Sequence, residues 1–302
     1  MGTRAHLRAE KLAEPSGSPD ARCELVRSLG AAVLTAPPGS AAVFEALGLP
    51  TPSGAEHTEV FVLSAPPHAA IHLGPEGKLG GEGLDKVSGF WRALGLRAPE
   101  DADHLGTLLL LYAELAQAER AAGDERRSAQ MHRARSALFH EHIWSWAPGY
   151  LAAVTSLGIA STTAWAEVTE QLLREERDEL GAPASLPLAL RDAPPGLDEA
   201  DSYDEVLDGL VAPIRSGAVL TPRDLSLGAR AVGVGLRRGE RRYALRAMLE
   251  QDAPGTLAWL SSHALSWSQG HASARTREGD ACEWWSKRAA HTAEVLDTMS
   301  SR

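Results

Sequence analysis

One segment restricts the possible folds of this chain more than any other, the leucine-rich stretch from Leu105 to Leu115. Its large apolar side chains include Leu105, Leu108, Leu109, Leu111, Tyr112 and Leu115. On an α-helix, where successive residues are about 100° apart, these positions cover most of the circumference. Because a helix that is apolar on most sides needs neighbours on most sides, we expect this one at the centre of a helical bundle.

Two features precede this central helix. A glycine-rich loop between Gly74 and Gly81 leads into a segment whose apolar residues are spaced as on one helix face: Leu84, Val87, Phe90, Trp91 and Leu94. The acidic sequence from Glu100 to His104 follows. Because aspartate is a preferred N-cap residue, Asp103 is predicted to cap the central helix.

The rest of the sequence also favours helix. Alanine, leucine, arginine and glutamate are frequent, whereas isoleucine, phenylalanine and tyrosine are scarce. Periodicity and capping residues predict helices over 21–34, 40–47, 124–146, 150–157, 163–181, 239–252, 254–267 and 280–299, and a helix that begins at 221–224. The prolines and glycines of 66–81 predict a loop, and the pattern of 56–63 fits a helix or a short strand. The predicted fold class is all-α.

Composition changes along the chain predict its domain organisation. Residues 1–20 are polar and contain Pro15, Gly17 and Pro19, which predicts a flexible tail. Residues 182–202 are rich in proline and acids, which predicts a linker between a domain over 21–181 and a helical extension over 203–302. Residues 101–210 carry 20 acids and 8 bases, whereas 211–302 carry 9 acids and 13 bases. This charge difference supports two modules.

Bulk properties exclude several classes of protein. The net charge of -10 argues against a general nucleic-acid binder. Two distant cysteines, Cys23 and Cys282, exclude a disulfide framework and any cysteine-rich metal or iron–sulfur site. No apolar run is long enough to cross a membrane, and the first residues lack the apolar core of a secretory signal. We therefore expect a cytoplasmic protein.

Few residue patterns point to catalysis or to a bound cofactor. His140 and His142 are two positions apart, so a helix would direct them about 200° apart and they could not share a metal ion. His68 and His72 have a better spacing but lie in the predicted loop and lack a third ligand. The sequence contains no GxSxG, HExxH or phosphate-binding loop. We expect neither enzymatic activity nor a cofactor or metal.

A cluster of arginines in the C-terminal part supports an alternative function. Its members are Arg237, Arg238, Arg241, Arg242 and Arg246. Such a cluster could bind phosphates or an acidic surface, although most charge runs are simply solvated. The alternative is therefore a helical regulatory or scaffold protein whose basic C-terminal segment contacts nucleic acid or an acidic partner.

Three segments resemble the TorD/DmsD/NarJ family of redox-enzyme maturation chaperones. The first is the loop FVLSAPPHAAIHLGPEGKLGGE, Phe61–Glu82. The second, Glu100-x-x-Asp103-His104, is similar to the family's E-P-x-D-H signature, with Asp101 and Ala102 in place of the usual residues. The third is ALFHEHIWSWAPGYLAAV, Ala137–Val154, which resembles a family segment where phenylalanine, histidine and tryptophan precede a proline. Together the segments fall within residues 21–180.

The resemblance implies an all-helical chaperone that binds the twin-arginine signal peptide, or the apo form, of a molybdopterin oxidoreductase precursor until its cofactor is loaded. It also implies helix 56–63 and homodimers by helix exchange. A signal peptide offers an arginine pair and an apolar stretch, so acids beside an apolar groove would suit it. The residues expected to bind it are Glu100, Asp101, Asp103, His104, Leu108 and Tyr112. Asp103 and His104 also suit a structural role, and the two roles are compatible.

Overall fold

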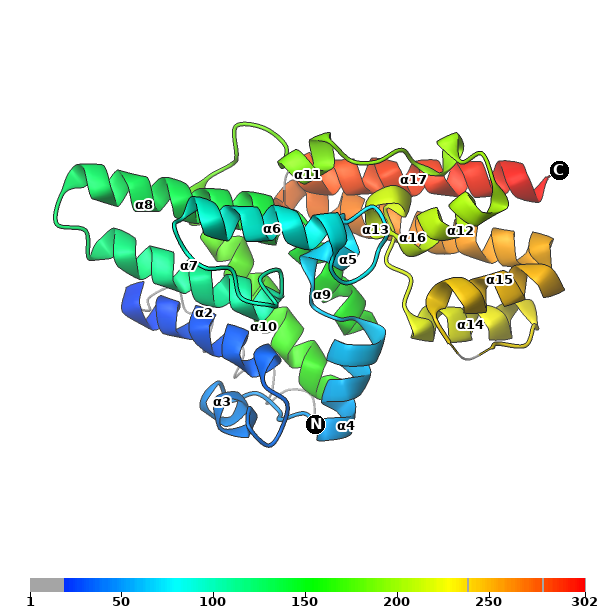
Figure 1. Cartoon of the computed structure of the whole chain (residues 1–302). Coiled ribbons are helices and arrows are strands. Elements are labelled where there is room, and N and C mark those ends of the chain that lie inside the picture. Colours follow the sequence, from blue (N-terminus) through cyan, green and yellow to red (C-terminus); the bar gives the residue numbers. More distant parts are fainter. Residues whose placement is uncertain (1–18, 238, 279, 302) are drawn as a thin grey trace.

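The computed structural model describes residues 19–237, 239–278 and 280–301, which form a bundle of helices (Figure 1). Within these residues no β-strand occurs, and the pairing of His68 with His104 is an isolated bridge. The all-α prediction is therefore confirmed. Most of the predicted tail of 1–20 lies outside the described residues, and the remainder, Pro19 and Asp20, begins the first helix.

The part of the chain up to Leu180 forms most of the larger hydrophobic core. Its helices are α2 (Pro19–Leu34), α3 (Ala41–Ala46), α4 (Gly54–His57), η1 (Thr58–Ser64), α5 (Ala69–Leu73), α6 (Gly81–Ala93), α7 (Leu105–Arg120), α8 (Glu125–Ala137), η2 (Leu138–Trp144), α9 (Ala147–Ser156) and α10 (Ala160–Leu180).

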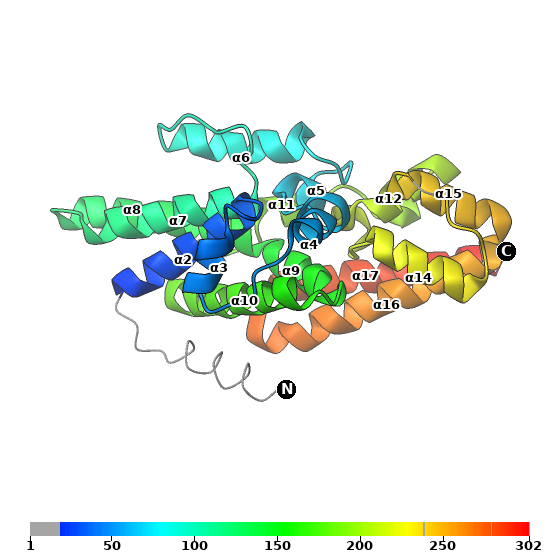
Figure 2. The same ribbon diagram turned by 90° about the horizontal axis from the view of Figure 1, so that it is seen from below.

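The leucine-rich helix α7 is central, as predicted. All six of the apolar side chains that define it are buried. It packs against α2 and α8, and Figure 2 shows α6 and α10 on opposite sides of it. At the crossing with α2, a Cβ on Gly30 would lie 2.8 Å from the carbonyl oxygen of Gly106. Glycine at this position therefore allows the two backbones to approach closely.

Two segments of the larger core are π-helical rather than α-helical, η1 and η2. The first settles the open interpretation of 56–63 in favour of helix. Phe61 of η1 meets the fully buried Trp165 of α10 edge to face, with ring centroids 5.3 Å apart. The indole of Trp165 also donates to the Leu29 carbonyl at 3.1 Å. Through these contacts η1, α2 and α10 share one packed layer.

The later part of the chain forms a second, smaller core. The helices of this part of the chain are α11 (Leu188–Arg191), η3 (Leu197–Glu199), α12 (Tyr203–Val211), α13 (Pro213–Ser216), α14 (Pro222–Val232), α15 (Arg241–Gln251), α16 (Ala253–Glu278) and α17 (Asp280–Ser300). The long helices α16 and α17 lie side by side (Figure 1). Thr221 and Asp224 cap α14 reciprocally, as the sequence predicts.

The two cores are joined by shared elements. Trp285 of α17 belongs to the larger core, where its indole donates to the Ser145 carbonyl at 2.9 Å, whereas Leu296 of the same helix belongs to the smaller core. The predicted linker of 182–202 contributes Leu190 to one core and Leu197 to the other. The division of the chain at this segment remains a prediction.

Two sequence-based boundaries were wrong. Residues 69–73 form the short helix α5 inside the predicted loop, because Asp103, distant in sequence, caps it. The helix expected over 254–267 continues to Glu278, because α17 packs along it. None of the described helices has both the length and the apolar character that a membrane crossing requires.

Candidate functional site

Two of the three segments on which the family resemblance rests, Phe61–Glu82 and the one that begins at Glu100, meet at the α5–α7 junction, which comprises residues 67–70 and 103–106. The backbones of these two segments hydrogen-bond to each other. Ala69 donates to the Asp103 carbonyl at 3.0 Å, and Leu105 donates to the Pro67 carbonyl at 2.7 Å. The start of α7 is thereby fixed to the loop that precedes α5.

The carboxylate of Asp103 is at the centre of the junction and only 2% exposed. It accepts a hydrogen bond from the backbone of Ala70 at 2.9 Å and lies 3.2 Å from Nδ1 of His68. Burial disfavours the charged form, but these two hydrogen bonds outweigh it, so the pKa of Asp103 lies below its usual value. Asp103 is therefore an ionised carboxylate that caps α5.

Two buried histidines of this region are held in the neutral form. Nδ1 of His104 accepts from the backbone of Gly106 at 3.0 Å, which makes His104 the N-cap of α7. Burial lowers the pKa of His104 to about 4. His72 stacks on Trp146 with 5.0 Å between ring centroids, and burial, with a smaller effect from Arg241, lowers its pKa to about 3.

The prediction that Asp103 caps the central helix is thus wrong. His104 caps α7 and Asp103 caps α5 instead. The antiparallel pairing of Pro67–Ala69 with 103–105 places the Asp103 carboxylate beside the first N–H groups of α5, which also need an acceptor. A local pattern cannot reveal this partner.

The six residues predicted to bind a peptide occupy three different environments. Glu100 and Asp101 are exposed, and Asp103 and His104 lie buried in the α5–α7 junction. Leu108 and Tyr112 are side chains of the larger core, with 0% and 1% exposure. The described conformation therefore presents only the first two to solvent, and peptide binding by all six remains a prediction.

Tyr112 belongs to a second buried polar cluster that the sequence reasoning missed. Its hydroxyl donates to the carboxylate of Glu176, which is 3% exposed and lies 2.9 Å from Nε of Arg22. The guanidinium of Arg135 stands 5.6 Å above the Tyr112 ring. Burial raises the pKa of Glu176 and also that of Tyr112. We call these residues, which line a cavity of about 230 Å³, the Tyr112 cluster.

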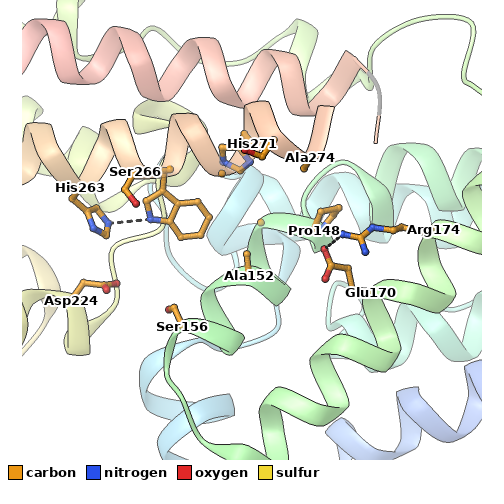
Figure 3. Close-up of a pocket in the computed structure, with 14 residues that line it drawn as sticks. Pro148, Ala152, Ser156, Glu170, Arg174, Asp224, His263, Ser266, His271 and Ala274 are labelled. Carbon is orange, nitrogen blue, oxygen red and sulfur yellow. Dashed lines mark hydrogen bonds and ion pairs between the residues drawn. The ribbon is translucent and has the colours of Figure 1, made fainter. Parts of the chain in front are cut away.

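A larger cleft of about 480 Å³ lies between α9 and α10 on one side and α16 on the other (Figure 3). We call it the aromatic cleft. The indole of Trp267 lines it and donates to Nε2 of His263 at 3.2 Å. Its acids already have partners, because Glu170 pairs with Arg174 and Asp224 caps α14. The aromatic cleft therefore offers stacking and hydrogen-bonding groups rather than free carboxylates.

The histidine pairs of the sequence have separate surroundings in the structure. His140 is edge-on to Phe139, whereas the ring of His142 is tilted against Phe90, with centroids 4.9 Å apart. His68 binds Asp103, while His72 stacks in the larger core. Among the described residues no group of three or more histidine, cysteine, aspartate or glutamate side chains could hold a metal ion.

Most of the basic cluster is used within the protein. Arg242 pairs with Asp208 and, at 2.9 Å, with Asp204, which also pairs with Arg246. Arg237 donates to the hydroxyl of Tyr243 at 3.0 Å. Arg238 lies outside the described residues. The pairing of Arg242 and Arg246 with aspartates weakens the argument for a broad nucleic-acid-binding surface, because the charges of these two arginines are already neutralised locally.

Comparison with known proteins supports the resemblance for one segment. Residues 51–152 match the family model described as nitrate reductase delta subunit, which is 102 of the 302 residues. No curated protein matches the chain. The matched segment contains the whole α5–α7 junction and most of the Ala137–Val154 segment. The family similarity to NarJ/TorD-type chaperones is thereby confirmed for this segment, and that family serves the maturation of molybdoenzymes.

Proposed function

We propose, from the match of residues 51–152 to a family of molybdoenzyme maturation chaperones, that this protein is a cytoplasmic chaperone rather than an enzyme. It binds the twin-arginine signal peptide, or the apo form, of a molybdopterin oxidoreductase subunit and assists cofactor insertion before export. The observation that carries the proposal is that the match includes the α5–α7 junction, with its Asp103 and His104.

The proposed peptide site begins at the exposed carboxylates of Glu100 and Asp101. These groups precede α7 and are free to meet two guanidinium groups, for which paired carboxylates are well suited. The apolar part of a signal peptide needs an apolar surface. Leu108 and Tyr112 are enclosed in the larger core and supply that surface only if helices packed against α7 move away from it. Client binding is therefore proposed to loosen the packing around α7.

Calorimetric titration with the leader peptide of the nearest-encoded molybdoenzyme tests this function. The comparison peptide carries two lysines in place of the two arginines. Binding should weaken at least tenfold in a variant that combines Glu100→Gln with Asp101→Asn, because both proposed carboxylates are lost. Glu45→Gln combined with Asp297→Asn removes two other exposed carboxylates and should leave binding unchanged.

Three outcomes separate the function from the site. Loss of binding in the Glu100 and Asp101 variant supports both. Binding that is as tight as in the wild-type protein, both in this variant and in the double variant Asp103→Ala with His104→Ala, keeps the chaperone function but contradicts the proposed site. If neither the leader nor the intact precursor binds, the proposed function itself is wrong.

A further inference from the structure

A second cleft lies where the matched segment meets the C-terminal extension. It has a volume of about 450 Å³ and is formed by residues 63–79 on one side and by residues of 211–242 on the other. Its apolar walls include Leu63, Ile71, Leu79 and Val219. We call it the cationic cleft because its charged residues are mainly basic: Lys78, Arg241 and Arg242, with Glu240 as the acid.

Arg241 brings a positive charge into this cleft without an internal counter-charge. Its guanidinium donates to the carbonyls of Gly77 and Leu220, each at 3.0 Å. These contacts fix its orientation but leave the charge uncompensated, and burial lowers the pKa of Arg241. Among the described residues no carboxylate forms an ion pair with it. A partly buried, unpaired cation favours an anion from outside the chain.

Lys78 and the start of α15 add to this positive potential. Lys78 is exposed and forms no ion pair within the described part of the chain. The eleven-residue helix α15 begins at Arg241, and its N-cap, Glu240, accepts no hydrogen bond from the helix through its side chain. The first N–H groups of α15 therefore remain available to an acceptor, where the helix dipole also favours negative charge.

The rim of the cationic cleft is apolar and exposed. Leu63 and Leu79 line the cleft and are each 60% exposed, and the neighbouring Val62 is 56% exposed. Such a patch is typical of a surface that binds another protein segment. His72 is the one aromatic ring in the lining of the cleft, which offers little for stacking a nucleotide base. The apolar rim therefore favours a peptide over a nucleotide.

We propose that the cationic cleft binds an extended apolar peptide segment of a partner protein through a carboxylate that Arg241 and Lys78 hold. The carboxylate is that of an acidic side chain within the segment, so that apolar residues on both of its sides can contact the rim. The required charge is opposite to that of a twin-arginine leader. The inference therefore concerns a second ligand and does not rest on the function proposed above.

Calorimetric titration of the full chain with short peptides tests this inference. The probes are acetyl-GLVDLVG-amide, its asparagine counterpart acetyl-GLVNLVG-amide, and acetyl-GLVNLVG with a free C-terminal carboxylate. The expected result is at least tenfold tighter binding of the aspartate peptide than of the uncharged peptide. Tight binding of only the peptide with the free C-terminus would contradict the proposal, because it would assign the charge to a chain terminus.

Variants locate the binding in the cleft. Lys78→Glu changes an exposed side chain that forms no ion pair, and it should weaken the binding of the aspartate peptide at least tenfold. Arg126→Glu makes the same charge change at an exposed position of α8 and should leave this binding unchanged. Arg241→Lys keeps the charge but loses the two-carbonyl geometry. It should also weaken the binding of the aspartate peptide, and its thermal unfolding is measured beside the binding to separate this effect from a loss of folding.

Several results would overturn the inference. Equal binding of the three peptides would show that no carboxylate is recognised. Unchanged binding in Lys78→Glu, or absence of binding at millimolar peptide, would exclude the cleft as the site. Tighter binding of GTP, with displacement of the aspartate peptide, would assign the cleft to a phosphate ligand instead.

Discussion

The start and the middle of helix α7 bury polar groups in different ways. At its start, the α5–α7 junction contains the neutral His104 and the carboxylate of Asp103, and each hydrogen bond is made within the matched residues 51–152. Further along, the Tyr112 cluster buries charged groups and recruits Arg22 and Glu176 from outside that segment.

This difference separates what the matched segment does alone from what the rest of the chain adds. The hydrogen bonds of the junction are made entirely within the matched segment, so they need no residue from outside it. The Tyr112 cluster depends on α2 and α10, so the burial of Tyr112 is set by this chain's own packing. His104 and Tyr112, two residues expected to contact a ligand, are therefore held in place by different parts of the chain.

Acidification should affect the buried histidines near the start of α7 and Glu176 of the Tyr112 cluster with opposite signs. The pKa of His72 is about 3 and that of His104 about 4 in the folded protein, below 6.5, so protonation favours the unfolded chain. Between pH 7 and pH 4.5 each histidine should lower the free energy of unfolding by about 2 to 3 kcal/mol. Glu176, whose pKa is raised, contributes stability below its unfolded value near 4.5 that is lost as pH rises through its folded value.

Urea unfolding at pH 7 and pH 4.5 measures this effect. His72→Phe keeps a ring against Trp146, and His104→Asn keeps a side-chain acceptor for the N-terminus of α7. The double variant should lose the part of the pH dependence that these two histidines contribute, and His142, whose pKa burial also lowers to about 4, should keep its own part. An unchanged dependence would show that these histidines are not neutral in the folded protein.

Replacing the carboxylate of the junction should produce the next largest effect. Asp103→Ala leaves the N–H of Ala70 and the ring of His68 without their acceptor, and we expect a loss of about 3 kcal/mol in the free energy of unfolding. Chemical denaturation is the measurement. Asp101→Ala, at an exposed position in the same acidic sequence, should change stability by less than about 0.5 kcal/mol. Equal losses would contradict the capping role of Asp103.

A smaller effect is expected in the Tyr112 cluster. Tyr112→Phe removes one hydrogen bond to Glu176 and should cost about 1.5 kcal/mol at pH 7. The hydrogen bond favours the charged carboxylate, so its loss should raise the pKa of Glu176 further and make the deficit smaller at pH 5. Tyr243→Phe, at an exposed tyrosine, provides the control. A deficit that is the same at both pH values would argue against an ionised Glu176.

Local patterns in the sequence predicted much of the fold. The spacing of Leu84, Val87 and Phe90 gave α6, and the apolar circumference of 105–115 gave the buried position of α7. Both depend only on residues within one helix. The capping box at Thr221 and Asp224 is likewise local, and it was found for the same reason.

Features that depend on distant residues could not be predicted. The helix α5 has five residues between prolines and glycines and is capped by Asp103, 33 positions beyond Ala70. The pairing of Tyr112 with Glu176 joins residues 64 positions apart. For the candidate site, the sequence identified Glu100 and Asp101 as acids before α7, but it could not show that Leu108 and Tyr112 are enclosed.

Helix α17 contributes side chains to both hydrophobic cores, and this limits where residues can be inserted or deleted in the chain during evolution. Trp285 and Leu296 are eleven positions apart, about three helical turns, so they lie within about 20° of each other around the helix. Deleting one residue between them would rotate one side chain relative to the other by about 100° and withdraw it from its core. Insertions and deletions should therefore be absent from 286–295 among homologous chains and frequent in irregular segments such as 192–196.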